Sequence, residues 1–353
     1  LCHFKFFCNS GLKLKVRRKR QIGSLEQGNL IHQCLECVLS SCKNKEEFDK
    51  LSRNQISKII EKCADDYFES NMGGVIKRNA RLESNLKRIK ENIFKIISHL
   101  QNELKQSEFR PINFEFNINE KGIANLTGDN GIEIVIRGVI DRVDIYESNG
   151  EKYIRVIDYK TGKKIFSMSS LLYGINLQML LYMFTITGSG GAYSDCNPAG
   201  VLYMPSGEIV CGRDRDESDN MEEYLNKHYK MNGVVLNDRA VLNAMEKDIQ
   251  GIYIPAKLLK GDTGDGELLL NKRSSSCLTS SQFKKLRQHT EKIIIDVCNE
   301  LYSGNIDADP LVISGGSPCD YCDYWSVCGN VPCEKYREAD KNAEEKMLKI
   351  ISD

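Results

Sequence analysis

An Asn149-Gly150 dipeptide separates two β-prone runs in the middle of the chain. Asn-Gly favours a two-residue turn between antiparallel strands. Such a turn also fixes which residues face each other across the hairpin. Here the register would set Asp141 directly opposite Asp158. This local geometry constrains the fold more tightly than any other short segment of the sequence.

Asp141 and Asp158 would share one face of the hairpin with Lys160, because side chains alternate along a strand. Like charges directly opposite each other destabilise a sheet. The arrangement is reasonable if a divalent cation lies between the carboxylates, with the lysine beside it. The alternative is that both acids lie in water at strand ends, with Lys160 as a counter-ion. The other residues expected on this face are apolar: Val143, Ile145, Ile154 and Val156.

The length and composition favour a globular protein. A chain of 353 residues is long enough for about two domains and a sizeable core. The sequence has no apolar run of roughly 18 residues and no signal peptide, so we expect no membrane span. The net charge of zero gives no general argument for a nucleic-acid partner. Because the chain begins with leucine and not methionine, we expect it to be part of a longer polypeptide. It has no G-x-x-x-x-G-K-[ST] motif, which excludes a complete ATP motor of that type.

A second motif lies near the C-terminus, where Cys319, Cys322 and Cys328 form a C-x2-C-x5-C pattern. Three thiolates on one loop predict a metal centre, but zinc and iron–sulfur sites usually have four ligands. The sequence alone distinguishes poorly between zinc and iron–sulfur. If the fourth ligand is Cys2, the centre joins the two ends of the chain. The candidates for the fourth ligand are Cys2, Cys8, Cys34 and Cys37, with Cys333 in reserve.

Hydrophobic periodicity predicts a chain of mixed helices and strands. His32 lies in the first expected helix, where a histidine can also be an ordinary surface or core residue. Gln178 and Tyr182 share one face of a later, mostly apolar helix, where Gln178 can also be a satisfied amide at the helix edge. The expected helices are 24–39, two or three within 45–106, 167–186 and 280–302. The expected strands are 113–118, 131–146, 153–160 and 199–204.

Four motifs, in this order along the chain, resemble the RecB-type branch of the PD-(D/E)xK nucleases. They are Gly28-x-x-x-His32-x-x-x-Glu36, Gly138-x-x-Asp141-Arg142-x-Asp144, Asp158-Tyr159-Lys160-Thr161-Gly162 and Gln178-x-x-x-Tyr182. The segment around Cys2 and the C-x2-C-x5-C loop narrow the resemblance to AddB-like subunits of bacterial AddAB helicase-nucleases. The resemblance covers nearly all of the chain and is thin across 44–110 and 206–275.

The resemblance implies roles for individual residues. His32, Asp141 and Asp158, with the carbonyl of Tyr159, would hold Mg²⁺. Lys160 would orient the attacking water or stabilise charge in the transition state. Gln178 and Tyr182 would support the site or the DNA backbone. Cys2, Cys319, Cys322 and Cys328 would ligate a [4Fe–4S] cluster.

The resemblance also implies an architecture and partners. The fold would be α/β, a restriction-endonuclease-like mixed sheet of four to five strands flanked by helices, with a helical insert and a terminal iron–sulfur clamp. We expect a cluster-ligand segment with the first nuclease helix at 1–43, the insert at 44–110, the nuclease core at 111–310, and the iron–sulfur loop and tail at 311–353. The implied partners are single-stranded DNA and duplex DNA ends, an AddA-like helicase subunit and the missing N-terminal part of the same polypeptide, in the bacterial cytoplasm.

The activity implied is metal-dependent hydrolysis of unwound single-stranded DNA, on the strand that ends 5′. Two other functions remain open from the sequence. One is a non-catalytic iron–sulfur module that binds DNA ends, and the intact acidic residues argue against it. The other is a CRISPR-associated RecB-like nuclease, and the long helical insert disfavours that assignment.

Overall fold

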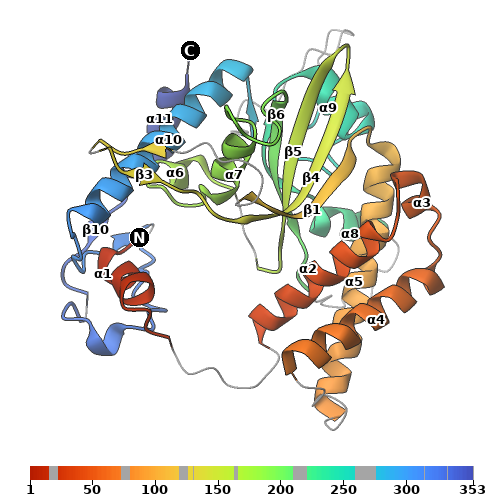
Figure 1. Cartoon of the computed structure of the whole chain (residues 1–353), viewed down its shortest axis with the longest axis horizontal. Coiled ribbons are helices and arrows are strands. Elements are labelled where there is room, and N and C mark those ends of the chain that lie inside the picture. The colour runs from red at the N-terminus through yellow and green to blue at the C-terminus, as the bar shows by residue number, and fades with distance from the viewer. Residues whose placement is uncertain are drawn as a thin grey trace.

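The computed structural model describes residues 1–15, 23–72, 80–118, 126–129, 131–162, 166–209, 221–258, 276–313, 315–331 and 333–352. Its centre is a mixed sheet of six strands in the order β1-β4-β5-β6-β7-β8 (Figure 1). The strand pairs β5·β6 and β7·β8 are parallel and the other neighbours are antiparallel. The strands are β1 (Arg110–Asn117), β4 (Val139–Ser148), β5 (Glu151–Lys160), β6 (Asn197–Pro205), β7 (Asn232–Leu236) and β8 (Cys277–Leu278). The predicted α/β class is confirmed, with more strands than the four to five expected.

The β4–β5 hairpin has the predicted register. Asp144 pairs with Arg155, and Tyr146 pairs with Tyr153. Asn149 and Gly150 form the turn, each with a positive φ, as a type I′ turn requires. The last pair recorded at the open end is Arg142 with Ile157, so the next step along the register sets Asp141 opposite Asp158. The apolar residues expected beside these acids, Val143, Ile145, Ile154 and Val156, are all buried.

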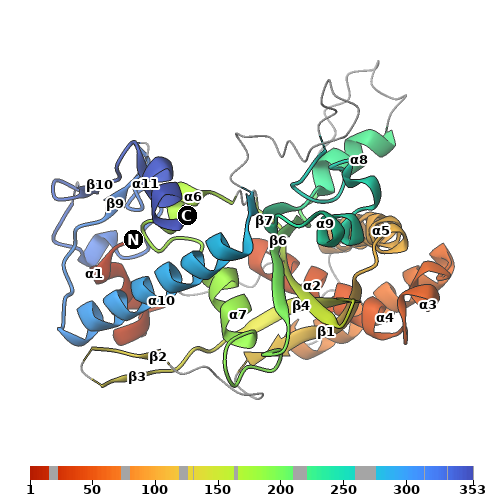
Figure 2. The same cartoon turned by 90° about the horizontal axis from the view of Figure 1, so that it is seen from above.

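Helices cover both faces of the sheet, with α7 (Gln178–Ile186) on one side and α5 (Ala80–Gln106) on the other (Figures 1 and 2). The helix α5 buries Ile89, Ile93, Ile97 and Leu100, whose spacing places them on one stripe. The helices α2 (Ser24–Ser40) and α4 (Arg53–Met72) pack against each other and against α5. The remaining helices of eight or more residues are α8 (Met221–Tyr229), α10 (Ser280–Tyr302) and α11 (Ala343–Ile351).

Shorter α-helices and strands are also present in the described part of the chain. The helices are α1 (His3–Phe6), α3 (Lys45–Asp49), α6 (Met168–Leu171) and α9 (Arg239–Met245). Two small sheets pair β2 (Leu126–Thr127) with β3 (Glu133–Ile134) and β9 (Leu311–Val312) with β10 (Arg337–Glu338). Within the described ranges, no helix combines the length and apolar character needed to cross a membrane.

Two predicted elements are wrong in their extent. The helix expected at 167–186 is divided into α6 and α7, because Gly174 and Asn176 adopt positive φ values of 71° and 63° between them. The strand expected at 131–146 is likewise interrupted, and β4 begins at Val139. The last helix, α10, spans Ser280–Tyr302 as predicted.

A network of buried charges joins α5 to the hairpin. Arg155 contacts Glu103 at 2.6 Å and Asp144 at 2.9 Å, and Arg142 also contacts Asp144 at 2.9 Å. All four side chains are at most 1% exposed. Because strand residues alternate, this network lies on the face of β4 opposite to Asp141. The network therefore holds the hairpin against α5 on one face, while Asp141 and Asp158 lie on the opposite face.

Candidate functional site

The predicted acidic residues gather at the open end of the β4–β5 hairpin. The side chain of Asp141 is 10% exposed and that of Asp158 is 6% exposed. Lys160 contacts Asp158, with 2.5 Å between Nζ and Oδ2. The lysine is therefore placed as the sequence predicts, beside the second carboxylate.

His32 reaches this end of the sheet from α2. Its Nδ1 lies 3.4 Å from Oδ2 of Asp141, and its Nε2 lies 2.8 Å from the carbonyl oxygen of Tyr159. A carbonyl only accepts hydrogen bonds, so Nε2 carries a proton and donates it to Tyr159. Nδ1 is then the ring nitrogen directed at the carboxylates. Metal-bound histidines commonly show this pattern, in which the other ring nitrogen donates to a backbone carbonyl.

Glu115 is a site residue that the motifs did not reveal. It lies on β1 between Phe114, which pairs with Arg142, and Phe116, which pairs with Ile140, so it faces Asp141. Its Oε1 is 3.9 Å from Nδ1 of His32. Ligand atoms of His32, Glu115 and Asp141 all lie within 4.8 Å of one another, the spacing of a metal site.

Around His32, Glu115 and Asp141, the negative charge of the carboxylates exceeds the positive charge close to them. Burial, together with the nearby charge of Asp141, raises the pKa of Glu115 to about 7. Burial acts to lower the pKa of His32, but its hydrogen bond and attraction to Asp141 raise that pKa above its ordinary value overall. The charge of Asp141 contributes to both shifts, because it repels the carboxylate of Glu115 and attracts the imidazolium of His32. A cation bound among them would relieve that repulsion.

Gln178 is the first residue of α7 and Tyr182 lies one turn further on, and Nε2 of Gln178 donates to the hydroxyl of Tyr182 at 3.1 Å. Tyr182 is buried, whereas Gln178 is exposed. Gly138, which directly precedes β4, leaves room for the tyrosine. A Cβ at that position would lie 2.1 Å from the hydroxyl of Tyr182. The second and fourth sequence motifs therefore meet in space.

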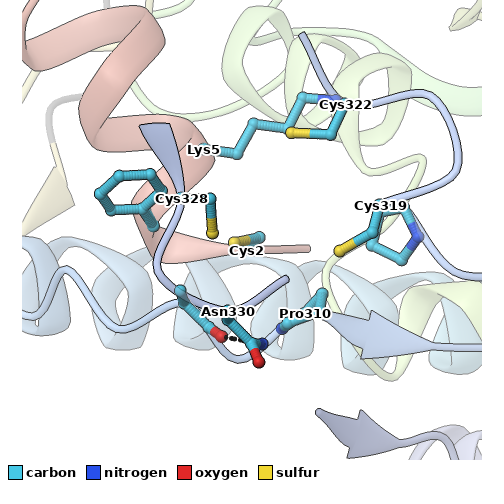
Figure 3. Close-up of a pocket in the computed structure, with 10 residues that line it drawn as sticks. Cys2, Lys5, Pro310, Cys319, Cys322, Cys328 and Asn330 are labelled. Carbon is cyan, nitrogen blue, oxygen red and sulfur yellow. Dashed lines mark hydrogen bonds between the residues drawn. The ribbon is translucent and has the colours of Figure 1, made fainter. Parts of the chain in front are cut away.

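The four cysteines of the expected cluster line one pocket, which Figure 3 shows. Cys2 enters it from the N-terminal segment, and Cys319, Cys322 and Cys328 enter from the C-terminal loop. Two further cysteines lie close by. The sulfur of Cys333 is 3.5 Å from that of Cys319. The pKa of Cys8 is raised, mainly by burial and to a lesser degree by the nearby thiol of Cys322.

Backbone contacts tie the two ends of the chain together beside this pocket. The N–H of Phe4 donates to the carbonyl of Asp307 at 3.2 Å, and the N–H of Leu311 donates to that of Leu1 at 2.9 Å. The hydroxyl of Tyr324 donates to the carbonyl of Leu14 at 2.9 Å. The other two sequence candidates for the fourth ligand, Cys34 and Cys37, lie on α2 and do not line the pocket.

Comparison with known proteins agrees with this site. The family model of the PD-(D/E)XK nuclease superfamily matches residues 1–329. Among similar curated proteins, the B subunit of the ATP-dependent helicase/deoxyribonuclease of Clostridium acetobutylicum is 27% identical over 99% of this chain and 31% of its own length. The proteins of the same name from Clostridioides difficile and Clostridium botulinum are 28% and 31% identical, over 99% and 98% of this chain. The chain thus spans about a third of the length of these relatives, 31% and 30% in the last two cases.

Proposed function

The chain belongs to the PD-(D/E)XK nuclease superfamily, and we propose that it is the nuclease module of an AddAB-type helicase-nuclease, which hydrolyses DNA phosphodiesters with Mg²⁺. The observation that carries this proposal is the convergence of His32, Glu115 and Asp141 beside the Asp158–Lys160 pair. The relatives, whose shared name contains helicase/deoxyribonuclease, support DNA as the substrate. By the same similarity, the module would act on unwound single strands, on the one that ends 5′.

The donor set fits a hard divalent cation. Mg²⁺ prefers oxygen ligands, and it is usually held by one or two carboxylates with water in the remaining positions. We assign Asp141, Asp158 and Nδ1 of His32 as ligands, and we add Glu115 as a further carboxylate. The carbonyl of Tyr159 already accepts a hydrogen bond from His32, and its second lone pair remains available to an ion. The pKa of Glu115, raised first by burial and then by the charge of Asp141, supports a cation at this position.

The bound ion would polarise a phosphoryl oxygen and lower the pKa of a coordinated water. The residues of the chain position the other participants. Lys160 places a fixed positive charge where the phosphate oxygens gain negative charge, which is the kind of stabilisation that preorganised groups supply. Asp158 holds that ammonium group in place. Tyr182, which is buried against Gly138 and accepts a hydrogen bond from Gln178, would support the site, and the exposed Gln178 would contact the DNA backbone.

The spread of the sulfurs in the cysteine pocket supports a cluster over a single zinc ion. A tetrahedral zinc with bonds of 2.3 Å needs sulfurs roughly 3.8 Å apart. Within the described residues, no three of the pocket cysteines have sulfurs that all lie within 4.8 Å of one another. We therefore assign Cys2, Cys319, Cys322 and Cys328 to a [4Fe–4S] cluster that clamps the two ends of the chain. Iron and sulfide analysis of the wild type and of Cys2→Ser, with Cys42→Ser as the control, tests that assignment.

The partners follow from the similarity to these helicase/deoxyribonuclease proteins. We propose that the module works beside an AddA-like helicase subunit and the rest of its own polypeptide, on duplex DNA ends that the complex unwinds, in the bacterial cytoplasm. We propose that 1–43, 44–110, 111–310 and 311–353 are its structural divisions.

A nuclease assay tests the proposal. A fluorescent single-stranded DNA is incubated with the chain and Mg²⁺, with EDTA and with the Asp158→Asn variant. We expect cutting with Mg²⁺ only, and a loss of about 10³-fold or more in the variant. Equal cutting by the Asp158→Asn variant would reject this site, and equal cutting in EDTA would reject the metal. Parallel substrates labelled at either end report the strand polarity.

A further inference from the structure

A third group of cysteines lies apart from both sites already described. Cys34 and Cys37 are on α2, three residues apart, and Cys63 approaches them from α4. The sulfurs of Cys37 and Cys63 are 2.7 Å apart. Neither the nuclease site nor the cysteine pocket uses these residues.

The three thiols differ in their access to solvent. Cys34 is fully buried and Cys63 is 4% exposed, whereas Cys37 is half-buried. The thiol of Cys63 donates to the carbonyl of Gln33 at 3.5 Å. A reagent in solution can therefore reach Cys37 first, and Cys63 lies directly behind it.

We propose that Cys37 and Cys63 form a reversible disulfide that crosslinks α2 to α4. A disulfide bond is about 2.05 Å long, so the sulfurs need to approach by only roughly 0.7 Å from their 2.7 Å separation. In cytosolic proteins such bonds are usually transient or redox-sensing, and they do not serve as permanent staples. The pair is a modification site that is independent of the nuclease proposal.

The reaction balances with a small disulfide such as oxidised glutathione as the oxidant. The thiolate of Cys37 attacks one sulfur of oxidised glutathione, and one reduced glutathione leaves. The thiolate of Cys63 then attacks the Cys37 sulfur of the mixed disulfide and releases the second glutathione. The protein loses two electrons and two protons, and the two glutathione thiols gain them.

Burial, together with the neighbouring thiol of Cys63, raises the pKa of Cys37 to about 12. The thiolate is the attacking form, so the exchange is slow at neutral pH and accelerates as the pH rises. This behaviour separates the pair from a fast peroxide sensor. At pH values below that pKa, the rate should rise about tenfold for each unit by which the pH is increased.

The crosslink would act on the helix that carries His32. The bond from Cys63 to the carbonyl of Gln33, the residue next to His32, is lost when the sulfur of Cys63 joins that of Cys37. The disulfide also closes the loop that contains α3, which restricts the unfolded chain. We expect the oxidised protein to be more stable, with its Tm raised by roughly 3–6 °C.

The test is a map of disulfide-linked peptides. The chain is incubated with reduced or oxidised glutathione at pH 8.5, alkylated and digested without reduction. We expect a peptide joining Cys37 to Cys63 after oxidation, and the rise in Tm with it. Cys37→Ser should abolish both, whereas Cys42→Ser, two residues beyond the end of the same helix, should retain both.

Two outcomes would overturn the proposal. One is glutathione attached to Cys37 while Cys63 remains alkylated as a free thiol. The other is a linkage of Cys63 to Cys34. The wild-type peptide map decides between these outcomes and the proposed pair, even if a serine variant folds poorly.

Discussion

The backbone N–H of Tyr159 donates a hydrogen bond to Oδ2 of Asp141 over 2.7 Å. The carbonyl of the same residue accepts from His32, and its hydroxyl accepts from Arg142 at 3.3 Å. Tyr159 thus joins α2, the acidic end of the hairpin and the buried charge network. Its side chain points to the network while its peptide holds two of the proposed metal ligands.

Lys160 is expected to contribute to the reaction and little to the fold. The Lys160→Met variant should cut DNA about 10²–10³-fold more slowly, which is the usual effect of removing one electrostatic donor from an active site. Lys152→Met is the matched control, because Lys152 lies on the same strand and pairs with Asp195 at 2.7 Å, away from the acids. A folded Lys160→Met variant that cuts as fast as Lys152→Met would remove the lysine from the mechanism.

Glu115 should make the metal-free protein less stable as the pH rises. Its folded pKa of about 7 exceeds its ordinary value of 4.5, so the folded state binds more protons between these values. The loss of folding stability caused by the charged Glu115 carboxylate is absent below about pH 4.5 and fully present above about pH 7. In EDTA, Glu115→Gln should therefore gain Tm relative to the wild type between pH 4.5 and pH 7.5. A difference in Tm that does not change with pH contradicts the assignment.

Gly138 is expected to be required for the position of Tyr182. In Gly138→Ala the new methyl group would lie 2.1 Å from the tyrosine hydroxyl, so the ring must move. Overpacking of this kind costs about 1–3 kcal/mol of unfolding free energy. The control is Gly162→Ala, where nothing lies within 4 Å of the added carbon. Urea unfolding of both variants measures the difference, and equal stabilities would show that the ring adjusts freely.

The buried charge network should be far more sensitive than a surface ion pair. Arg155→Met leaves the carboxylates of Glu103 and Asp144 without one of their partners, which typically costs about 3–5 kcal/mol in a buried site. Arg110→Met removes a pair with Glu147 of similar length, 2.8 Å, but both partners are exposed. That change should cost at most about 1 kcal/mol. Similar losses in the two variants would mean that burial does not govern these pairs.

The sequence predicts best those features that short-range geometry sets. The Asn149-Gly150 turn fixes the β4–β5 register, so the placement of Asp141 opposite Asp158 in that register follows from local residues. Glu115 could not be found in this way. Its strand, β1, is joined to β4 by a long segment and not by a tight turn, and no local signal sets that register.

Other differences have similar physical causes. The apolar periodicity of 167–186 hides the positive φ values at Gly174 and Asn176 that divide the helix. Arg142 and Arg155 are fully buried, although charged residues are almost never buried unless they are paired, and their partner Glu103 comes from a distant helix. The spacing of the cysteines left several fourth ligands open, and the fold brings Cys2 to the loop.

Binding of Mn²⁺ to the metal-free chain, followed by electron paramagnetic resonance, tests the central claim that a cation holds the opposed carboxylates together. We predict one tightly bound ion per chain that Mg²⁺ displaces. That binding should be lost in Asp141→Asn and kept in Asp195→Asn, which changes an exposed carboxylate on the same molecule. Binding by Asp141→Asn that equals the wild type would contradict the account.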